Sequence, residues 1–194
     1  MDQKYWYNFY TSAFANDLSS PSDFCLFVLN FFDSISVFNV LDAGCGNGRD
    51  SYKLGERYNV LGVDSSGFRL ESKNNCKFVQ DNFVTIDKSS FDLVYTRFTF
   101  HSITGEDQCL FLDSLGIGTY LALETRSDKS IDETRYYGDQ HYRNFTNLQY
   151  LRDILGRYGY DIMYIREDKD FAKYRDENPY CIRVICRRVL RERL

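Results

Sequence analysis

The sequence has few of the residues that build metal sites, covalent cross-links and membrane spans. Among its 194 residues are two histidines and six cysteines, and no two cysteines form a C-x-x-C pair. Zinc sites and disulfide frameworks normally show such spacing, so we expect no metal ion and reduced cysteines. No apolar run reaches the ~18 residues that a membrane-spanning helix needs, and the polar start Met1-Asp2-Gln3-Lys4 is unlike a signal peptide. We therefore expect a cytoplasmic protein without a membrane span.

The charge balance is slightly acidic. Twenty-four Lys and Arg residues stand against 28 Asp and Glu residues, which gives a net charge of −4. This balance argues against a nucleic acid as the main partner. No repeat or linker divides the chain, so we expect residues 1–194 to form a single domain. Within it, residues 1–35 should form helices, of which the first offers Trp6 and Tyr10 as lid contacts and Phe9 for packing.

Strand-like apolar runs alternate with helix-like patterns along most of the chain. The expected strands cover 38–42, 59–63, 77–79, 91–96, 119–124, 160–166 and 180–187. The expected helices cover 23–32, 49–57, 66–73, 105–115 and 146–157, with Ser22 and Thr146 as N-caps. This alternation predicts an α/β fold with a mostly parallel seven-stranded sheet and helices on both faces. Because no helix separates the last two strands, we expect an antiparallel C-terminal edge strand.

A glycine-rich turn follows the first expected strand. Gly44, Gly46 and Gly48 can adopt positive φ and let a ligand lie against the backbone. The following helix offers unpaired N–H groups at its start. Asp64 ends the second strand, 22 positions after Asp42. An acid at that place is suited to accept hydrogen bonds from a ribose diol.

The glycine spacing separates two classes of nucleotide cofactor. A dinucleotide fingerprint G-x-G-x-x-G counted from Gly44 would require glycine at position 49, where the chain has Arg49. The run is instead D-x-G-x-G-x-G, and the acid Asp42 suits a cofactor with a cationic amino group. This pattern resembles the Rossmann-like, class I S-adenosylmethionine-dependent methyltransferases. The resemblance implies S-adenosyl-L-methionine as cofactor, bound by Asp42, Gly44, Cys45, Gly46, Asn47, Asp64, Ser65, Asp81, Asn82, Phe83 and Arg97.

Two methyltransferase chemistries lack their motifs here. Enzymes that methylate amino groups of bases carry [D/N]-P-P-[Y/F] after the fourth strand, whereas Asn178-Pro179-Tyr180 precedes the last strand and lacks the second proline. Methylation of the cap ribose uses a Lys-Asp-Lys-Glu tetrad whose aspartate would stand where this chain has Arg97. We therefore set both chemistries aside.

Three further segments resemble methyltransferases found with surface-glycan and phosphorylated-sugar biosynthesis. These are R-F-x-x-H at 97–101, E-x-R-S at 124–127 and H-Y-R-x-F at 141–145, where Asn144 replaces a second arginine. The resemblance implies O-methylation of a small, anionic acceptor such as a sugar, a sugar phosphate or a glycan end. Arg97, Arg126, Tyr142 and Arg143 would bind this acceptor. His141 would take its proton, with His101 as the second candidate base; if neither acts, proximity alone could drive the transfer.

Other functions stay open at this point. The arginines near the C-terminus could serve an RNA or protein methyltransferase, although a solvated sheet edge accounts for them as well. They are Arg183, Arg187, Arg188, Arg191 and Arg193. The chain could also be a methyltransferase-like binding partner without turnover. The sequence does not reveal the oligomeric state or the need for a partner subunit.

Overall fold

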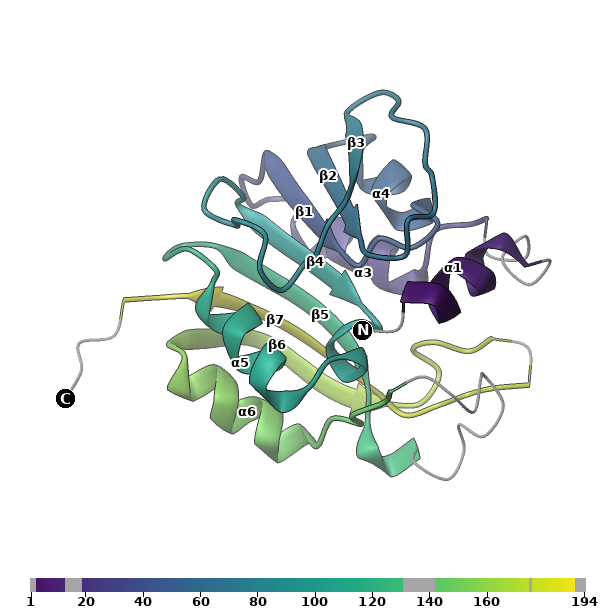
Figure 1. Cartoon of the computed structure of the whole chain (residues 1–194). Helices are drawn as coiled ribbons and strands as arrows, with labels where there is room; N and C mark the ends of the chain where they lie inside the picture. The colour runs from purple at the N-terminus through teal and green to yellow at the C-terminus, as the bar shows by residue number, and fades with distance from the viewer. Residues whose placement is uncertain (1–2, 13–18, 131–141, 175, 191–194) are drawn as a thin grey trace.

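A single twisted sheet organises the protein (Figure 1). The computed structural model describes residues 3–12, 19–130, 142–174 and 176–190. Seven strands pair in the order β3-β2-β1-β4-β5-β7-β6. They are β1 (Asn39–Ala43), β2 (Asn59–Asp64), β3 (Cys76–Gln80), β4 (Leu93–Arg97), β5 (Tyr120–Arg126), β6 (Tyr160–Asp168) and β7 (Cys181–Arg188). The mostly parallel seven-stranded sheet is therefore confirmed.

The expected antiparallel pair at the edge of the sheet is formed by β6 and β7, and the last strand of the chain is β7. It pairs with β5 through Tyr120↔Arg187 to Arg126↔Cys181, and with β6 on its other side. β6, rather than β7, is consequently the edge strand. The alternating arginines of β7 thus do not protect a free edge, because neighbouring strands occupy both sides of this strand.

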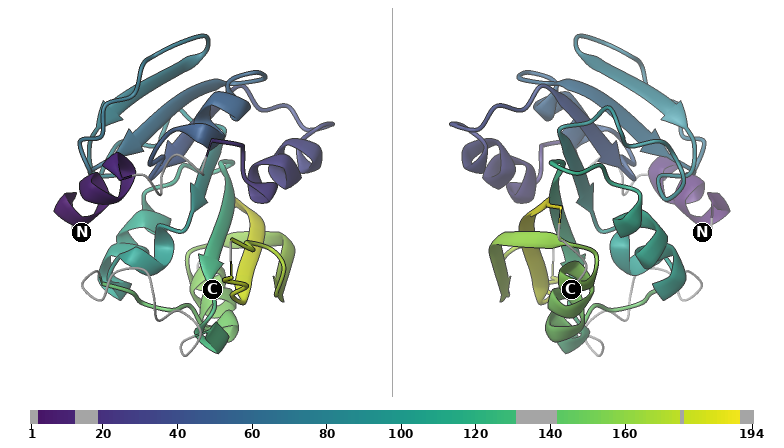
Figure 2. Two further views of the ribbon diagram at one scale, coloured as in Figure 1. Left: turned by 90° about the vertical axis from the view of Figure 1, so that its right-hand side faces the viewer. Right: turned by 90° about the vertical axis from the view of Figure 1, so that its left-hand side faces the viewer.

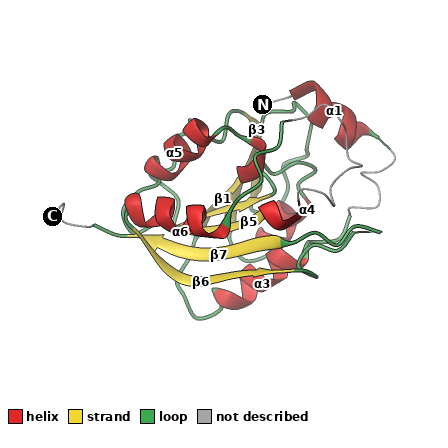
Figure 3. Cartoon of the chain, turned by 90° about the horizontal axis from the view of Figure 1, so that it is seen from below, coloured by secondary structure: helices red, strands yellow, loops and turns green. Residues whose placement is uncertain are grey.

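Helices cover both faces of the sheet (Figures 2 and 3). They are α1 (Gln3–Thr11), α3 (Asp23–Phe31), α4 (Arg49–Leu54), α5 (Gly105–Asp113) and α6 (Leu148–Arg157), with short 3₁₀ turns η1 (Phe100–Ser102) and η2 (Asp128–Ser130). One core packs α3 and α4 on the sheet through Phe24, Val28 and Leu54. The other packs α5 and α6 on the opposite face through residues such as Phe111 and Leu155.

Side-chain caps explain where the helices begin. The Ser22 hydroxyl accepts a hydrogen bond from the Cys25 N–H at 3.1 Å, which confirms the predicted cap of α3. The prediction of Thr146 as the cap of α6 is wrong. Asn147 performs this role by accepting from the N–H groups of Gln149 and Tyr150. Thr146 is instead buried, with its hydroxyl 3.1 Å from that of Thr125.

The helix expected over 66–73 does not form. Gly67 has φ +73°, a left-handed conformation that interrupts a helix. The Ser66 N–H donates to Oδ1 of Asp64 at 2.8 Å instead of starting a helical turn. The segment is therefore an irregular connection between β2 and β3. Among the helices of the described residues, none is long and apolar enough to cross a membrane.

Candidate active site

The glycine loop after β1 has the backbone that its sequence predicts. Gly44, Gly46 and Gly48 have φ values of +82°, +55° and +75°. The N–H of Gly44 donates to the Val63 carbonyl at 2.7 Å, which fixes the loop beside β2. A Cβ on Gly44 would collide with Cγ2 of Thr99, and one on Gly46 with the hydroxyl of Tyr10. No side chain larger than hydrogen fits either position without rearrangement.

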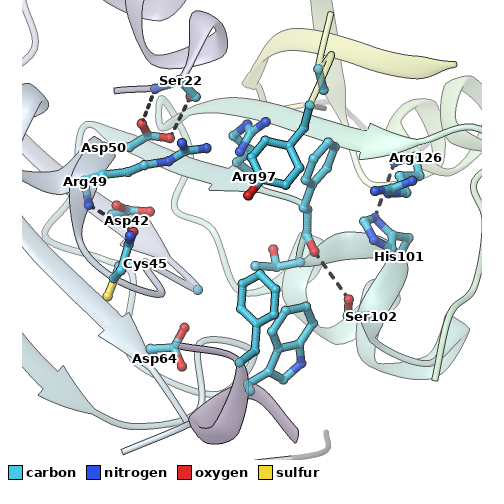
Figure 4. A pocket seen from close by; sticks show the side chains of 18 of the residues that line it. Ser22, Asp42, Cys45, Arg49, Asp50, Asp64, Arg97, His101, Ser102 and Arg126 are labelled. Carbon is cyan, nitrogen blue, oxygen red and sulfur yellow. Dashed lines mark hydrogen bonds between the residues drawn. The ribbon is translucent and has the colours of Figure 1, made fainter. Parts of the chain in front are cut away.

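The two acids of the motif lie on either side of this loop (Figure 4). Oδ2 of Asp64 accepts the Gly46 N–H at 2.9 Å, and Oδ1 accepts the Ser66 N–H at 2.8 Å. Because a carboxylate oxygen has two lone pairs, each can accept one more hydrogen bond. Asp42 is buried and accepts a hydrogen bond from the Ser51 hydroxyl at 2.5 Å. Burial, aided by the charges of Asp50 and Asp64, raises the Asp42 pKa to about 8.

Asp50 and Arg49, at the start of α4, were not predicted as site residues. Asp50 accepts hydrogen bonds at 2.7 Å from the N–H and hydroxyl of Ser22 and from the Tyr95 hydroxyl. This network ties the beginning of α3 to the glycine loop. Arg49 points into the same cavity, and burial together with the neighbouring charge of Arg97 lowers its pKa.

The predicted cofactor residues surround two hollows that both border α1. A cavity of about 350 Å³ is lined by Asp42, Gly44, Cys45, Asn47, Asp64, Phe83 and Arg97. Its volume lies within the usual range for small-molecule sites. A second hollow is lined by Gln3, Ser65, Gln80, Asp81 and Asn82. The structure thus gathers all of the predicted set around these two hollows except Gly46, which Tyr10 covers.

Aromatic side chains of α1 line the main cavity. Trp6 and Tyr10 stack with ring centroids 6.1 Å apart, and Tyr10 contacts the Phe68 ring at 5.9 Å. Burial, with a further contribution from Asp64, raises the Tyr10 pKa. Trp6 and Tyr10 line the cavity at the position expected of a lid. Phe9 lines the cavity beside them and does not pack in the core.

Phe98 follows β4 with a strained backbone. Its φ is +60°, which is rare for a bulky side chain and costs on the order of 1–3 kcal/mol. The Phe98 N–H donates to the Glu124 carbonyl at 2.9 Å. Its ring centroid lies 4.3 Å from the Arg97 guanidinium and 5.4 Å from that of Arg126. Such strain persists where surroundings hold it, often at functional sites. Sequence alone does not reveal it.

Arg97, Arg126 and Arg143 line one cavity, as predicted, but the first two have carboxylate partners. Nε of Arg97 donates to Oε1 of Glu124 at 2.8 Å, and Nε of Arg183 donates to Oε2 of the same carboxylate at 2.6 Å. Glu124 is fully buried. This three-residue network fixes Arg97 at the cavity wall.

Arg126 pairs with Glu177, from the connection between β6 and β7. Nη2 of Arg126 donates to Oε2 of Glu177 at 2.9 Å. The Arg143 pKa is lowered by burial and by the nearby charge of Arg126. Tyr142, the fourth predicted acceptor residue, is 53% exposed and is absent from the residues that line the cavity.

His101 also lines the cavity and is buried beside β5. The Arg126 backbone N–H donates to Nδ1 at 3.3 Å, and the Thr125 hydroxyl lies at the same distance. Since a backbone N–H can only donate, Nδ1 accepts, and the proton of the neutral ring sits on Nε2. This arrangement suits a hydrogen-bond donor better than the predicted base. The other candidate base, His141, lies outside the described residues.

Comparisons with known proteins agree with this geometry. Residues 40–115 match the family described as a methyltransferase domain. The CcbJ methyltransferase of Streptomyces caelestis shares the fold with a TM-score of 0.73 at 14% identity, over 98% of this chain and 100% of that one. The match and the fold support an S-adenosylmethionine-dependent methyltransferase. No curated protein sequence matches this chain.

Two more solved structures share the fold. A methyltransferase of this type from Methanosarcina mazei has a TM-score of 0.68 at 17% identity, with 84% of this chain and 98% of that one covered. The 1,6-didemethyltoxoflavin-N1-methyltransferase of Burkholderia thailandensis, solved with its acceptor and S-adenosylhomocysteine, has a TM-score of 0.65 at 15% identity over 86% and 76% of the two chains.

The residues at the loop fit S-adenosyl-L-methionine, the cofactor. Gly44 and Gly46 keep the backbone free of Cβ atoms, and Asp64 has two acceptor positions left for a ribose diol. Asp42 lines the cavity as a buried carboxyl next to the loop, where a bound cationic amino group would favour its ionised form. Metal ligation is not part of this fit, because the described residues contain no cluster of three or more metal-ligating side chains.

Proposed function

We propose that the protein methylates a hydroxyl group of a small, anionic acceptor such as a sugar, a sugar phosphate or a glycan end. The observation that carries this proposal is the crowding of guanidinium groups around one cavity. Burial and the neighbouring charge of Arg126 lower the pKa of Arg143, and burial and the charge of Arg97 lower that of Arg49. A phosphate or carboxylate bound beside Arg143 offsets this concentration of positive charge and accepts hydrogen bonds from the guanidinium group.

Each part of the site has a task in this reaction. Asp64, the glycine loop and Asp42 hold S-adenosyl-L-methionine, which supplies a methyl group on a positively charged sulfur. Arg143 and Arg126 orient the acceptor, because in-line displacement depends on the alignment of the reacting atoms. His101 donates from Nε2 to an acceptor oxygen. His141 remains the proposed base at the reacting hydroxyl.

The RNA and protein alternative has less support. Arg183 is bonded to Glu124, and Nε of Arg187 donates to the Gly118 carbonyl at 3.0 Å. Nη1 of Arg188 donates to the carbonyls of Leu112 and Leu115. These three arginines therefore serve the fold, while Arg191 and Arg193 lie outside the described residues. The didemethyltoxoflavin enzyme and a magnesium protoporphyrin IX methyltransferase are named for small acceptors, which favours a small acceptor here.

The test is methyl transfer from isotope-labelled S-adenosyl-L-methionine to a panel of sugar phosphates, nucleotide sugars, neutral sugars, RNA and peptides. Mass spectrometry detects the product, and NMR locates the methyl group on oxygen or nitrogen. Arg143→Gln should raise KM for the acceptor about tenfold or more, which is about 1.4 kcal/mol of binding, and leave KM for the cofactor within about twofold. Arg152→Gln, an exposed arginine of α6, is the matched control.

Transfer to RNA or a peptide alone would refute the proposal. So would an uncharged acceptor whose kinetics Arg143→Gln leaves unaltered. Binding of cofactor without transfer to any acceptor of the panel would favour a methyltransferase-like binding partner.

A further inference from the structure

The ion pair between Arg126 and Glu177 is incomplete. Arginine and carboxylate groups commonly form two parallel hydrogen bonds, but this pair forms one, from Nη2 to Oε2. Nη1 of Arg126 and Oε1 of Glu177 are both buried, and neither has a hydrogen-bond partner among the described residues. An unsatisfied buried polar atom is unfavourable, and more so when it is charged. Two such atoms in one ion pair that lines the cavity point to a ligand that satisfies both.

Both partners are held in place by their surroundings. Arg126 ends β5, its backbone N–H donates to His101, and its guanidinium lies over the Phe98 ring. Glu177 exchanges two backbone hydrogen bonds of 2.9 Å with Tyr174. Next to it, the Asp170 N–H donates to the Asn178 side chain at 2.8 Å, and Nδ2 of Asn178 donates back at the same distance. The surroundings of both residues therefore fix an ion pair with only this one hydrogen bond between its charged groups.

The chemistry of the two free atoms restricts the ligand. A phosphate or carboxylate would accept from Nη1 of Arg126 but place a like charge against Oε1 of Glu177. An amine would bind Glu177 and be repelled by Arg126. A neutral group that both accepts and donates satisfies the two atoms together and brings no additional charge to the pair. Two neighbouring hydroxyl groups do so, since one oxygen accepts from Nη1 while the other donates its proton to Oε1.

We propose that Arg126 and Glu177 form a subsite for a vicinal diol of the acceptor. The proposal rests on the proposed function and deepens it. The acceptor is polyhydroxylated, and this pair binds the hydroxyls that are not methylated. The anionic group of the same acceptor lies toward Arg143. Burial and the nearby charge of Arg126 lower the pKa of this arginine. The subsite then acts in positioning and in specificity, and takes no proton from the reacting oxygen.

The experiment compares ligands that differ only in their hydroxyls. Calorimetry on protein saturated with S-adenosylhomocysteine measures the binding of inositol 1-phosphate, cyclohexyl phosphate and inositol. Inositol 1-phosphate should bind at least about tenfold more tightly than cyclohexyl phosphate, because its hydroxyls form two hydrogen bonds to charged groups that cyclohexyl phosphate cannot form. The double variant Arg126→Met/Glu177→Met should abolish this ratio, since it removes the pair without leaving one charge buried.

A matched control replaces the surface pair Lys53 and Glu56 of α4 by methionine. This variant should keep the wild-type ratio, and both variants should bind S-adenosylhomocysteine within about twofold of wild type. Equal affinity for the two phosphates in wild type, as expected if water alone fills the subsite, would overturn the proposal. An undiminished ratio of the two affinities in the double variant would overturn it too. So would tight binding of phosphates that carry a benzamide group in place of the hydroxyls.

The outcomes separate this subsite from the proposed anionic acceptor. If inositol binds as tightly as inositol 1-phosphate and loses affinity only in the double variant, the subsite stands and the anionic acceptor is wrong. If both phosphates bind equally and Arg143→Gln weakens both, the anion site stands and the diol subsite is wrong.

Discussion

Replacing Asp42 with asparagine should stabilise the protein progressively as the pH rises from about 5 to about 8. The folded protein holds the Asp42 pKa at about 8, against an ordinary value of 3.8. Between these values the folded state binds a proton that the unfolded chain has released. The unfolding free energy therefore falls as pH rises, and the part due to Asp42 is lost by the time the pH reaches its folded pKa.

The size of the effect follows from the shift. One pH unit within the window changes the unfolding free energy by about 1.4 kcal/mol for one proton. Over three units, the gap between Asp42→Asn and wild type should widen by about 4 kcal/mol and then level off above pH 8. Asparagine keeps an oxygen that can accept from the Ser51 hydroxyl, so the comparison isolates the charge.

Urea unfolding of both proteins at five pH values measures this gap. The control is Asp87→Asn, whose exposed carboxyl has a pKa lowered by hydrogen bonds from Ser89 and is ionised in both states across the window. Its stability should run parallel to wild type between pH 5 and 9. A constant difference between Asp42→Asn and wild type would show that the buried carboxyl is ionised throughout, and would refute the reasoning.

Three further substitutions test the site. Asp64→Ala should weaken binding of S-adenosyl-L-methionine about 10–150-fold, equivalent to roughly 1.5–3 kcal/mol, as measured by calorimetry; unchanged affinity would contradict its role. Gly44→Ala should abolish binding or lower the melting temperature sharply, because φ is +82° and Thr99 fills the space; a wild-type melting curve with intact binding would contradict this. His141→Gln should lower kcat by roughly 10²–10⁴-fold and remove a rise in rate near pH 6.5, whereas a retained rise would exclude it as the base.

The sequence was sufficient for features that depend on local pattern. The glycine spacing and Asp64 predicted the loop, and strand periodicity predicted the sheet, because backbone conformation and burial leave direct marks on residue type. Glu177 could not be found this way. It meets Arg126 across 51 positions of sequence, and nothing near Glu177 distinguishes it from a surface glutamate. The strained backbone of Phe98 could not be predicted from the sequence either, since the surrounding structure imposes it.

The order of the strands and the position of the α6 cap could not be predicted from local sequence patterns either. The place of β7 between β5 and β6 depends on which strand pairs with β5. The cap of α6 lay one residue from its prediction because threonine and asparagine are both good caps. The Thr146 hydroxyl instead lies 3.1 Å from that of Thr125 in the interior.

The contact between Tyr10 and the glycine loop has a kinetic consequence. A ligand that lies against Gly46 and the Tyr10 hydroxyl cannot occupy the same space. The measured affinity for S-adenosyl-L-methionine is then its intrinsic affinity multiplied by the fraction of molecules in which Tyr10 has withdrawn. If withdrawal precedes binding, the observed association rate will approach a plateau at high cofactor concentration, set by how often α1 shifts. Trimming the Tyr10 ring would then speed capture of the cofactor.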